Sequence, residues 1–143
     1  MAQLAIEEKE QQTAKEILTF VLENTKDLEL LIQAHTFLIQ MRIDTAQEKD
    51  FKSIASDLDV LLKEFGISPY SLSLQIMQAH FSTFYLKQAE QGKLVLNAAL
   101  ELPLNEYQKA DVKMELADIL LFEEKFNQAL IYYSQIEEDL KND

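Results

Sequence analysis

The sequence predicts an all-α fold in which helix–turn–helix hairpins stack side by side. The 143 residues include only 2 Gly and 2 Pro, whereas a sandwich or barrel needs many turn residues. Apolar residues recur at mixed three- and four-residue steps almost from end to end, which is the period of an amphipathic helix. Phe51, Ala89 and Phe126 take matching places in three of these segments, at spacings of 38 and 37 residues. A repeat of this length is typical of stacked helical hairpins.

Seven helices are expected within one domain, residues 1–143. Ser68 before Pro69 predicts a helix start, because the missing N–H of proline falls where no helical bond is due. Asn105 followed by Gln108 predicts a capping box at another start. The expected elements are a leading helix at 3–23 and three hairpin units at 27–65, 69–102 and 106–140.

Composition limits the kind of partner. The chain carries 25 acidic and 13 basic residues, a formal net charge of −12. Such a charge repels phosphate groups, so we expect no nucleic acid and favour a neutral or basic protein or peptide, although the charge also serves solubility. Since no apolar run approaches the ~18 residues of a membrane span, we expect no membrane insertion. The compartment is not predicted; it would be the cytoplasm if the chain is complete.

Few residues are candidates for catalysis. The chain has no Cys, which excludes disulfides, thiolate metal sites and cysteine nucleophiles. His35 and His80 lie on different expected helices, and neither has a partner at metal-ligand spacing. Because His80 lies between Ala79 and Phe81, we expect a satisfied, partly buried imidazole there. The two glycines are isolated and form no phosphate-binding loop. We therefore expect no enzyme, no cofactor and no metal site.

A small residue marks the second helix of each later unit. Gly92 and Ala129 each come three residues after the aligned Ala89 and Phe126. Gly inside a helix costs about 1 kcal/mol relative to Ala, so close approach of a neighbouring helix should compensate. Such a residue lets the first helix of its own unit come close. Ile54 stands at the corresponding place of the first unit, where we expect looser packing.

Residues 110–143, ADVKMELADILLFEEKFNQALIYYSQIEEDLKND, resemble a tetratricopeptide repeat. The residues that carry this resemblance are Leu116, Ala117, Phe126, Ala129 and Tyr133. It implies a short right-handed superhelix of paired helices. With the small residues of the preceding unit added, the residues expected at packing contacts between repeat helices are Gly92, Ala99, Leu116, Ala117, Phe126, Ala129 and Tyr133.

The chain also departs from the family pattern. Lys113 stands where a large aromatic residue is usual, Glu124 replaces the turn glycine and Lys141 the closing proline. In the two earlier units the small place of the first helix is taken by Arg42 and His80, so those units match only in their second helices. The further helix that usually covers the last repeat is missing as well, which favours a fragment of a longer array.

A partner-binding groove follows from the resemblance. In the family the first helix of each unit lines the concave face, which would here be apolar with a rim of carboxylates. The alternative is that these residues are simply core. Transferred through the repeat register, the groove residues are Leu74, Met77, Phe81, Phe84, Tyr85, Asp111, Met114, Asp118 and Phe122.

These observations favour a non-catalytic interaction module that binds a peptide or helix of a partner on the concave face. The first alternative is a structural spacer or scaffold segment, which packs on further repeats or forms a homo-oligomer through its exposed terminal faces. A helical enzyme or small-ligand domain is a third reading, and it would require an enclosed pocket with titratable groups.

Overall fold

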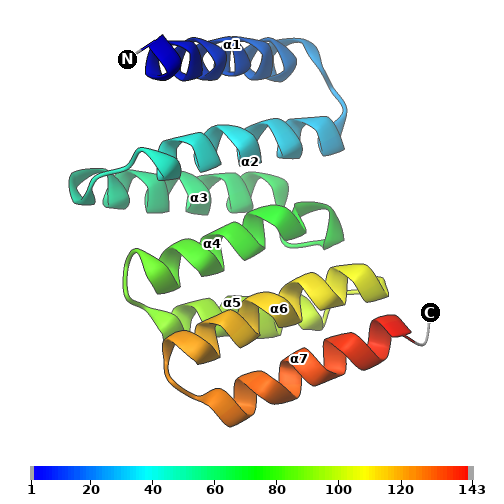
Figure 1. Ribbon diagram of the computed structural model, residues 1–143. Helices are drawn as coiled ribbons and strands as arrows, with labels where there is room; N and C mark the ends of the chain where they lie inside the picture. Colours follow the sequence, from blue (N-terminus) through cyan, green and yellow to red (C-terminus); the bar gives the residue numbers. More distant parts are fainter. Residues whose placement is uncertain (1, 142–143) are drawn as a thin grey trace. The chain divides into compact units, whose positions relative to one another are not determined.

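The computed structural model describes residues 2–141, and their side chains from residue 5 onward (Figure 1). The described residues contain seven α-helices and no strand, which confirms the predicted all-α class. None of these helices is both long and apolar enough to span a bilayer. The helices are α1 (Ala2–Asn24), α2 (Leu28–Asp44), α3 (Phe51–Phe65), α4 (Leu72–Phe84), α5 (Ala89–Leu100), α6 (Glu106–Phe122) and α7 (Phe126–Lys141).

The chain divides into two compact units, residues 1–47 and 48–143. In the first unit α1 packs against α2, which begins where the Asp27 carboxylate accepts hydrogen bonds from two backbone N–H groups. The boundary falls inside the predicted hairpin of residues 27–65, so the two helices of that hairpin belong to different units. Their pairing, the single domain and the superhelical arrangement therefore stay predictions.

The second unit is built from neighbouring helices that pack in chain order. The pairs α4–α5 and α6–α7 form two hairpins, α5 packs on α6, and α3 packs on α4 (Figure 1). This arrangement is compatible with a helical repeat. A continuous core runs through α4, α5 and α6, and its buried members are Leu72, Ala79, Leu96, Ala99, Leu104, Val112, Leu116 and Ile119.

The helix starts use the predicted capping residues. The Asn105 side chain accepts from the Gln108 backbone N–H at 2.8 Å, and the Gln108 side chain accepts from the Asn105 N–H at 2.9 Å. This reciprocal pair satisfies two donors that have no partner within the helix. Ser68 also caps a start, but the helix opens with a short 3₁₀ turn, Pro69–Ser71, before α4.

Both hairpin turns place a residue in the left-handed region. Lys87 has φ of +60° and Glu124 has φ of +63°, and each lies two residues before the next helix. In each turn the following N–H bonds at 2.8 Å to a carbonyl near the end of the first helix, Ser82 or Leu120. Glu124, noted in the sequence as replacing the turn glycine, thus adopts the conformation that glycine favours.

Within each hairpin, the two helices come closest where both carry a small residue. A Cβ added at Gly92 would lie 2.9 Å from the carbonyl oxygen of Ala79 and 2.2 Å from the Thr83 hydroxyl, so only glycine fits this approach. In the next hairpin the buried Ala129 packs in one cluster with the buried Ala117. These contacts place the predicted small residues at the crossing points.

The register between the hairpins differs by one residue from the sequence alignment. The α4–α5 turn spans residues 85–88, whereas the α6–α7 turn spans 123–125. The first helices therefore align at a spacing of 38, which matches Ala117 with the fully buried Ala79. The assignment of His80 to the small place was wrong, because the longer turn shifts α4 by one residue.

Five of the seven expected packing residues are buried, and two need comment. Tyr133 is half-buried, and its hydroxyl donates to Asp118 at 2.7 Å. Phe126 is 62% exposed and does not belong to the core, which corrects its predicted packing role. Phe126 is the first residue of α7, and helical side chains lean toward the N-terminus, so its ring projects past the end of the packed hairpin. The buried five are Gly92, Ala99, Leu116, Ala117 and Ala129.

Substitution Gly92→Ala tests the crossing contact. We expect it to lower the free energy of unfolding by up to about 2 kcal/mol, because overpacking costs about 1–3 kcal/mol and the better helix propensity of Ala returns about 1 kcal/mol. Urea denaturation measures the change. Asn97→Ala, on the exposed side of the same helix, is the control and should not destabilise. A gain in stability for Gly92→Ala would contradict the close approach.

Substitution Glu124→Gly tests the turn. A left-handed conformation costs an L-residue about 1–2 kcal/mol, so glycine should raise the free energy of unfolding by about 1 kcal/mol. The control Gln135→Gly, at an exposed interior position of α7, should lower it by about 1 kcal/mol instead. Equal losses for the two variants, measured by thermal and urea denaturation, would argue against a left-handed Glu124.

Candidate functional site

The strongest candidate site lies on the first helices of the two hairpins. Helices α4 and α6 contact each other, and five side chains of mixed chemistry meet where they do. We call this area the α4–α6 surface, and its residues are His80, Phe84, Glu115, Asp118 and Phe122. All belong to the second unit.

Side-chain hydrogen bonds at this surface connect three helices, α4, α6 and α7. The Nδ1 atom of His80 lies 2.6 Å from Oε1 of Glu115, which joins α4 to α6. The Tyr133 hydroxyl donates to the Asp118 carboxylate at 2.7 Å, which joins α6 to α7. The His80 side chain remains 48% exposed, whereas Glu115 is largely covered. The His80 imidazole is therefore oriented by Glu115 and still exposed enough to form a hydrogen bond with a partner.

Aromatic rings form the apolar part of the α4–α6 surface. The His80 ring lies 4.6 Å from the Phe84 ring, and Phe84 meets Phe122 edge-to-face at 5.2 Å between centroids. The Lys87 Nζ atom lies 5.4 Å from the centre of the Phe122 ring, within the range of a cation–π contact. Phe84 is half-buried and Phe122 is exposed, so the cluster presents ring area to solvent.

The surroundings shift the pKa values of His80 and of Tyr133, which lies on α7 and bonds to this surface. The hydrogen bond to Glu115 raises the pKa of His80 above its ordinary value of 6.5; burial opposes this, and the charges of Glu115 and Asp118 add to it. Burial, followed by the bond to Asp118, raises the pKa of Tyr133 to about 12. Tyr133 therefore stays a neutral donor, while His80 is poised to carry a positive charge.

The structure separates the nine predicted groove residues into three groups. Leu74 and Phe81 are fully buried, so they cannot contact a partner and their assignment is corrected. At the spacing of 38 they match Val112 and Ile119, which are buried as well. Asp111, Met114 and Phe122 are exposed, and the remaining four, half-buried, are Met77, Phe84, Tyr85 and Asp118.

Phe81 illustrates why the prediction failed for these two. Its ring stacks on Tyr85 at 5.0 Å and meets Phe51 edge-on at 5.7 Å. The one-residue register error aligned these α4 core positions with two carboxylates of α6, the exposed Asp111 and the half-buried Asp118. A helix turns about 100° per residue, so a shift of one exchanges a buried side for an exposed one.

Two residues of the surface were missed by the sequence analysis. His80 was expected to be a satisfied, partly buried imidazole, which its bond to Glu115 and its 48% exposure confirm, but it was not predicted to belong to a binding surface. Glu115 carried no signal, because its partner lies 35 residues away in the chain. Within residues 2–141, no three His, Cys, Asp or Glu side chains gather as metal ligands would.

No protein-family model, curated protein or solved structure matches the chain. The α4–α6 surface combines accessible ring area with an imidazole–carboxylate pair.

The His80–Glu115 pair predicts a pH dependence of stability. Because the pKa of His80 is raised on folding, its contribution is complete below the unfolded value of 6.5 and is lost as pH rises through the native pKa. The free energy of unfolding should therefore carry a downward step there, and NMR titration of the imidazole should locate it. Glu115→Gln should lower the His80 pKa and remove the step. An unchanged His80 pKa in that variant would contradict the pairing.

Proposed function

We propose that this protein is a non-catalytic, tetratricopeptide-like interaction module that binds a segment of a partner protein along the α4–α6 surface. The partner segment is a peptide or helix with apolar side chains and Lys or Arg. The proposal includes no cofactor and no catalytic residue.

The repeat-like features of the second unit support the tetratricopeptide-like assignment. Each hairpin has a left-handed turn residue two positions before its second helix, at Lys87 and Glu124. Each also has a buried small residue in the second helix, at Gly92 and Ala129, opposite an alanine of the first. Turn and crossing point thus recur together, as expected of one unit used twice.

The single observation that carries the binding proposal is the accessible cluster of His80, Phe84 and Phe122 beside two carboxylates, Glu115 and Asp118. Aromatic side chains supply a large contact area at a small entropy cost, which is why they dominate binding hot spots. The formal net charge of −12 favours encounter with a basic segment.

A scaffold role, by packing on further repeats or on a second copy, is favoured by a different observation. Helix α7 exposes Phe126, Leu130 and Ile131, each more than half accessible. Exposed apolar side chains on one helix suit contact with another helix. This alternative places the interface on α7 and leaves the α4–α6 surface free.

Selection from a random peptide library tests the binding proposal. We expect enriched peptides to combine Lys or Arg with apolar residues, and Phe84→Ala or Phe122→Ala to weaken their binding at least about tenfold, about 1.4 kcal/mol. Fluorescence anisotropy measures affinity, and circular dichroism verifies folding. Leu94→Ala, an exposed apolar residue on α5, is the matched control and should bind like the parent chain.

Peptides that bind all three variants alike would contradict the site. If no peptide is enriched and sedimentation shows a dimer that Leu130→Asp disrupts, the scaffold role is favoured instead.

A further inference from the structure

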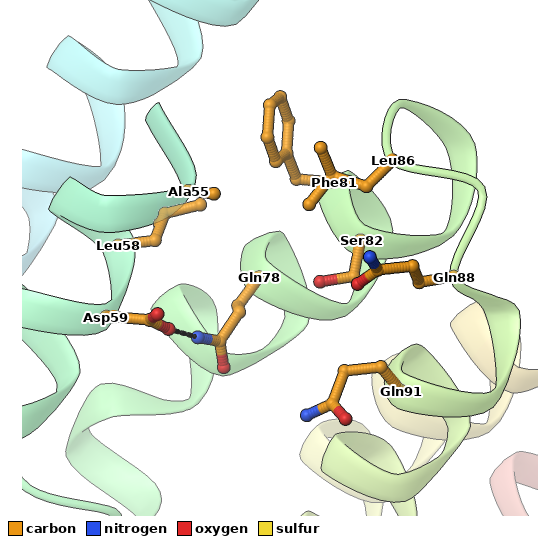
Figure 2. Close-up of a pocket in the computed structure, with 9 residues that line it drawn as sticks. All are labelled: Ala55, Leu58, Asp59, Gln78, Phe81, Ser82, Leu86, Gln88 and Gln91. Atoms are coloured by element: carbon orange, nitrogen blue, oxygen red, sulfur yellow. Dashed lines mark hydrogen bonds between the residues drawn. The ribbon is translucent and has the colours of Figure 1, made fainter. Parts of the chain in front are cut away.

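A half-open cleft lies between α3, α4 and α5, away from the α4–α6 surface. In Figure 2, Ala55 and Leu58 of α3 face Ser82 and Gln91 across an open space, which has a volume of about 240 Å³. All its lining residues belong to the second unit. Gln78 and Ser82 line the cleft on α4. Each residue turns a helix by about 100°, and His80 and Phe84 come two residues after them. The cleft and the α4–α6 surface therefore lie on different sides of α4.

The position equivalent to the cleft in the next layer of helices can be found by aligning α3 with α5. The buried residues of α3 match those of α5 at a spacing of 38, Ile54 with Gly92 and Leu58 with Leu96. At that spacing Ala55 of the cleft corresponds to Lys93.

Lys93 crosses from α5 to the end of α6. Its Nζ atom lies 2.7 Å from the Glu123 carboxylate and 2.8 Å from Glu90, and its side chain is mostly covered. On the α4 side, Ser82 of the cleft corresponds to Leu120, which is buried. At the two places where the cleft has Ala55 and Ser82, the next layer of helices therefore has Lys93 and Leu120. The aliphatic chain of Lys93 and its ammonium occupy the space equivalent to the one that Ala55 leaves open.

The walls of the cleft offer the contacts that a lysine side chain needs. Leu58 and Phe81 lie behind the cleft and are fully buried, so its reachable apolar area comes from Ala55 and Leu86. Around the opening stand the Asp59 carboxylate, which accepts a hydrogen bond from Gln78, and the side-chain amide of Gln91 (Figure 2). An ammonium has three N–H donors and no acceptor, so a carboxylate and amide oxygens match it.

We propose that this cleft binds a lysine side chain from a partner protein. The aliphatic stem lies against Ala55 and Leu86, and the ammonium bonds to Asp59 and to amide oxygens of the rim. Lysine buries its methylene stem readily while its charge stays near water, as this half-open geometry requires. The site is separate from the α4–α6 surface, so neither proposal depends on the other.

The probe for this site is N-acetyl-lysine methylamide, followed in amide NMR spectra of the whole chain. We expect saturating shifts confined to backbone amides around Ala55, Ser82 and Gln91, with millimolar affinity. Ala55→Leu, which fills the cleft, should abolish them. Asp59→Asn should weaken binding at least about fivefold, and Glu64→Gln, an equal charge change at an exposed position of α3, should leave it unchanged.

Several results would overturn the proposal. The absence of saturating shifts at the cleft, or their persistence in a folded Ala55→Leu, would do so. Equal binding of the norleucine analogue would show that the ammonium is not recognised. Tighter binding of cadaverine would assign the cleft to a free diamine rather than to a protein lysine. If Ala55→Leu does not fold, the comparison of Asp59→Asn with Glu64→Gln decides between charge-specific recognition and none.

Discussion

The close approach of paired helices is the constraint on which the second unit depends. At Gly92 the backbone of α5 comes so near the Ala79 carbonyl that no side chain fits between them. Ala117 and Ala129 make the corresponding contact one hairpin later. With the helices held this close, the larger apolar residues beside Ala79 pack into a core shared by α4, α5 and α6.

The turns decide which residues this packing exposes. The α4–α5 turn is one residue longer than the α6–α7 turn, so the first helices align at a spacing that differs from that of the second helices. That difference directs Phe81 into the core and leaves His80 at the surface within reach of Glu115. A single residue in a loop thus selects the chemistry of the α4–α6 surface.

The space beside α4 and the equivalent space beside α6 are lined by different side chains, which explains why the cleft opens beside α4. The chain fills the space beside α6 with its own Lys93 and Leu120, and leaves the equivalent space beside α4 to Ala55 and Ser82. Two surfaces of different chemistry therefore lie on different sides of α4. One presents aromatic rings with an imidazole–carboxylate pair, and the other is a cleft lined mainly by amide, hydroxyl and carboxylate side chains.

The sequence by itself determined the helices, their caps and the small residues of the second helices, because these depend on local periodicity, on hydrogen bonds within three residues and on side-chain volume. It therefore predicted the capping box at Asn105 and the burial of Ala129. Only the tertiary structure decided which face of α4 is buried and which charges meet, since Glu115 and His80 are far apart in the chain. Whether Glu115 and His80 come together depends on the length of the α4–α5 turn, because each added residue rotates a helix by about 100°. Local sequence patterns do not predict that rotation.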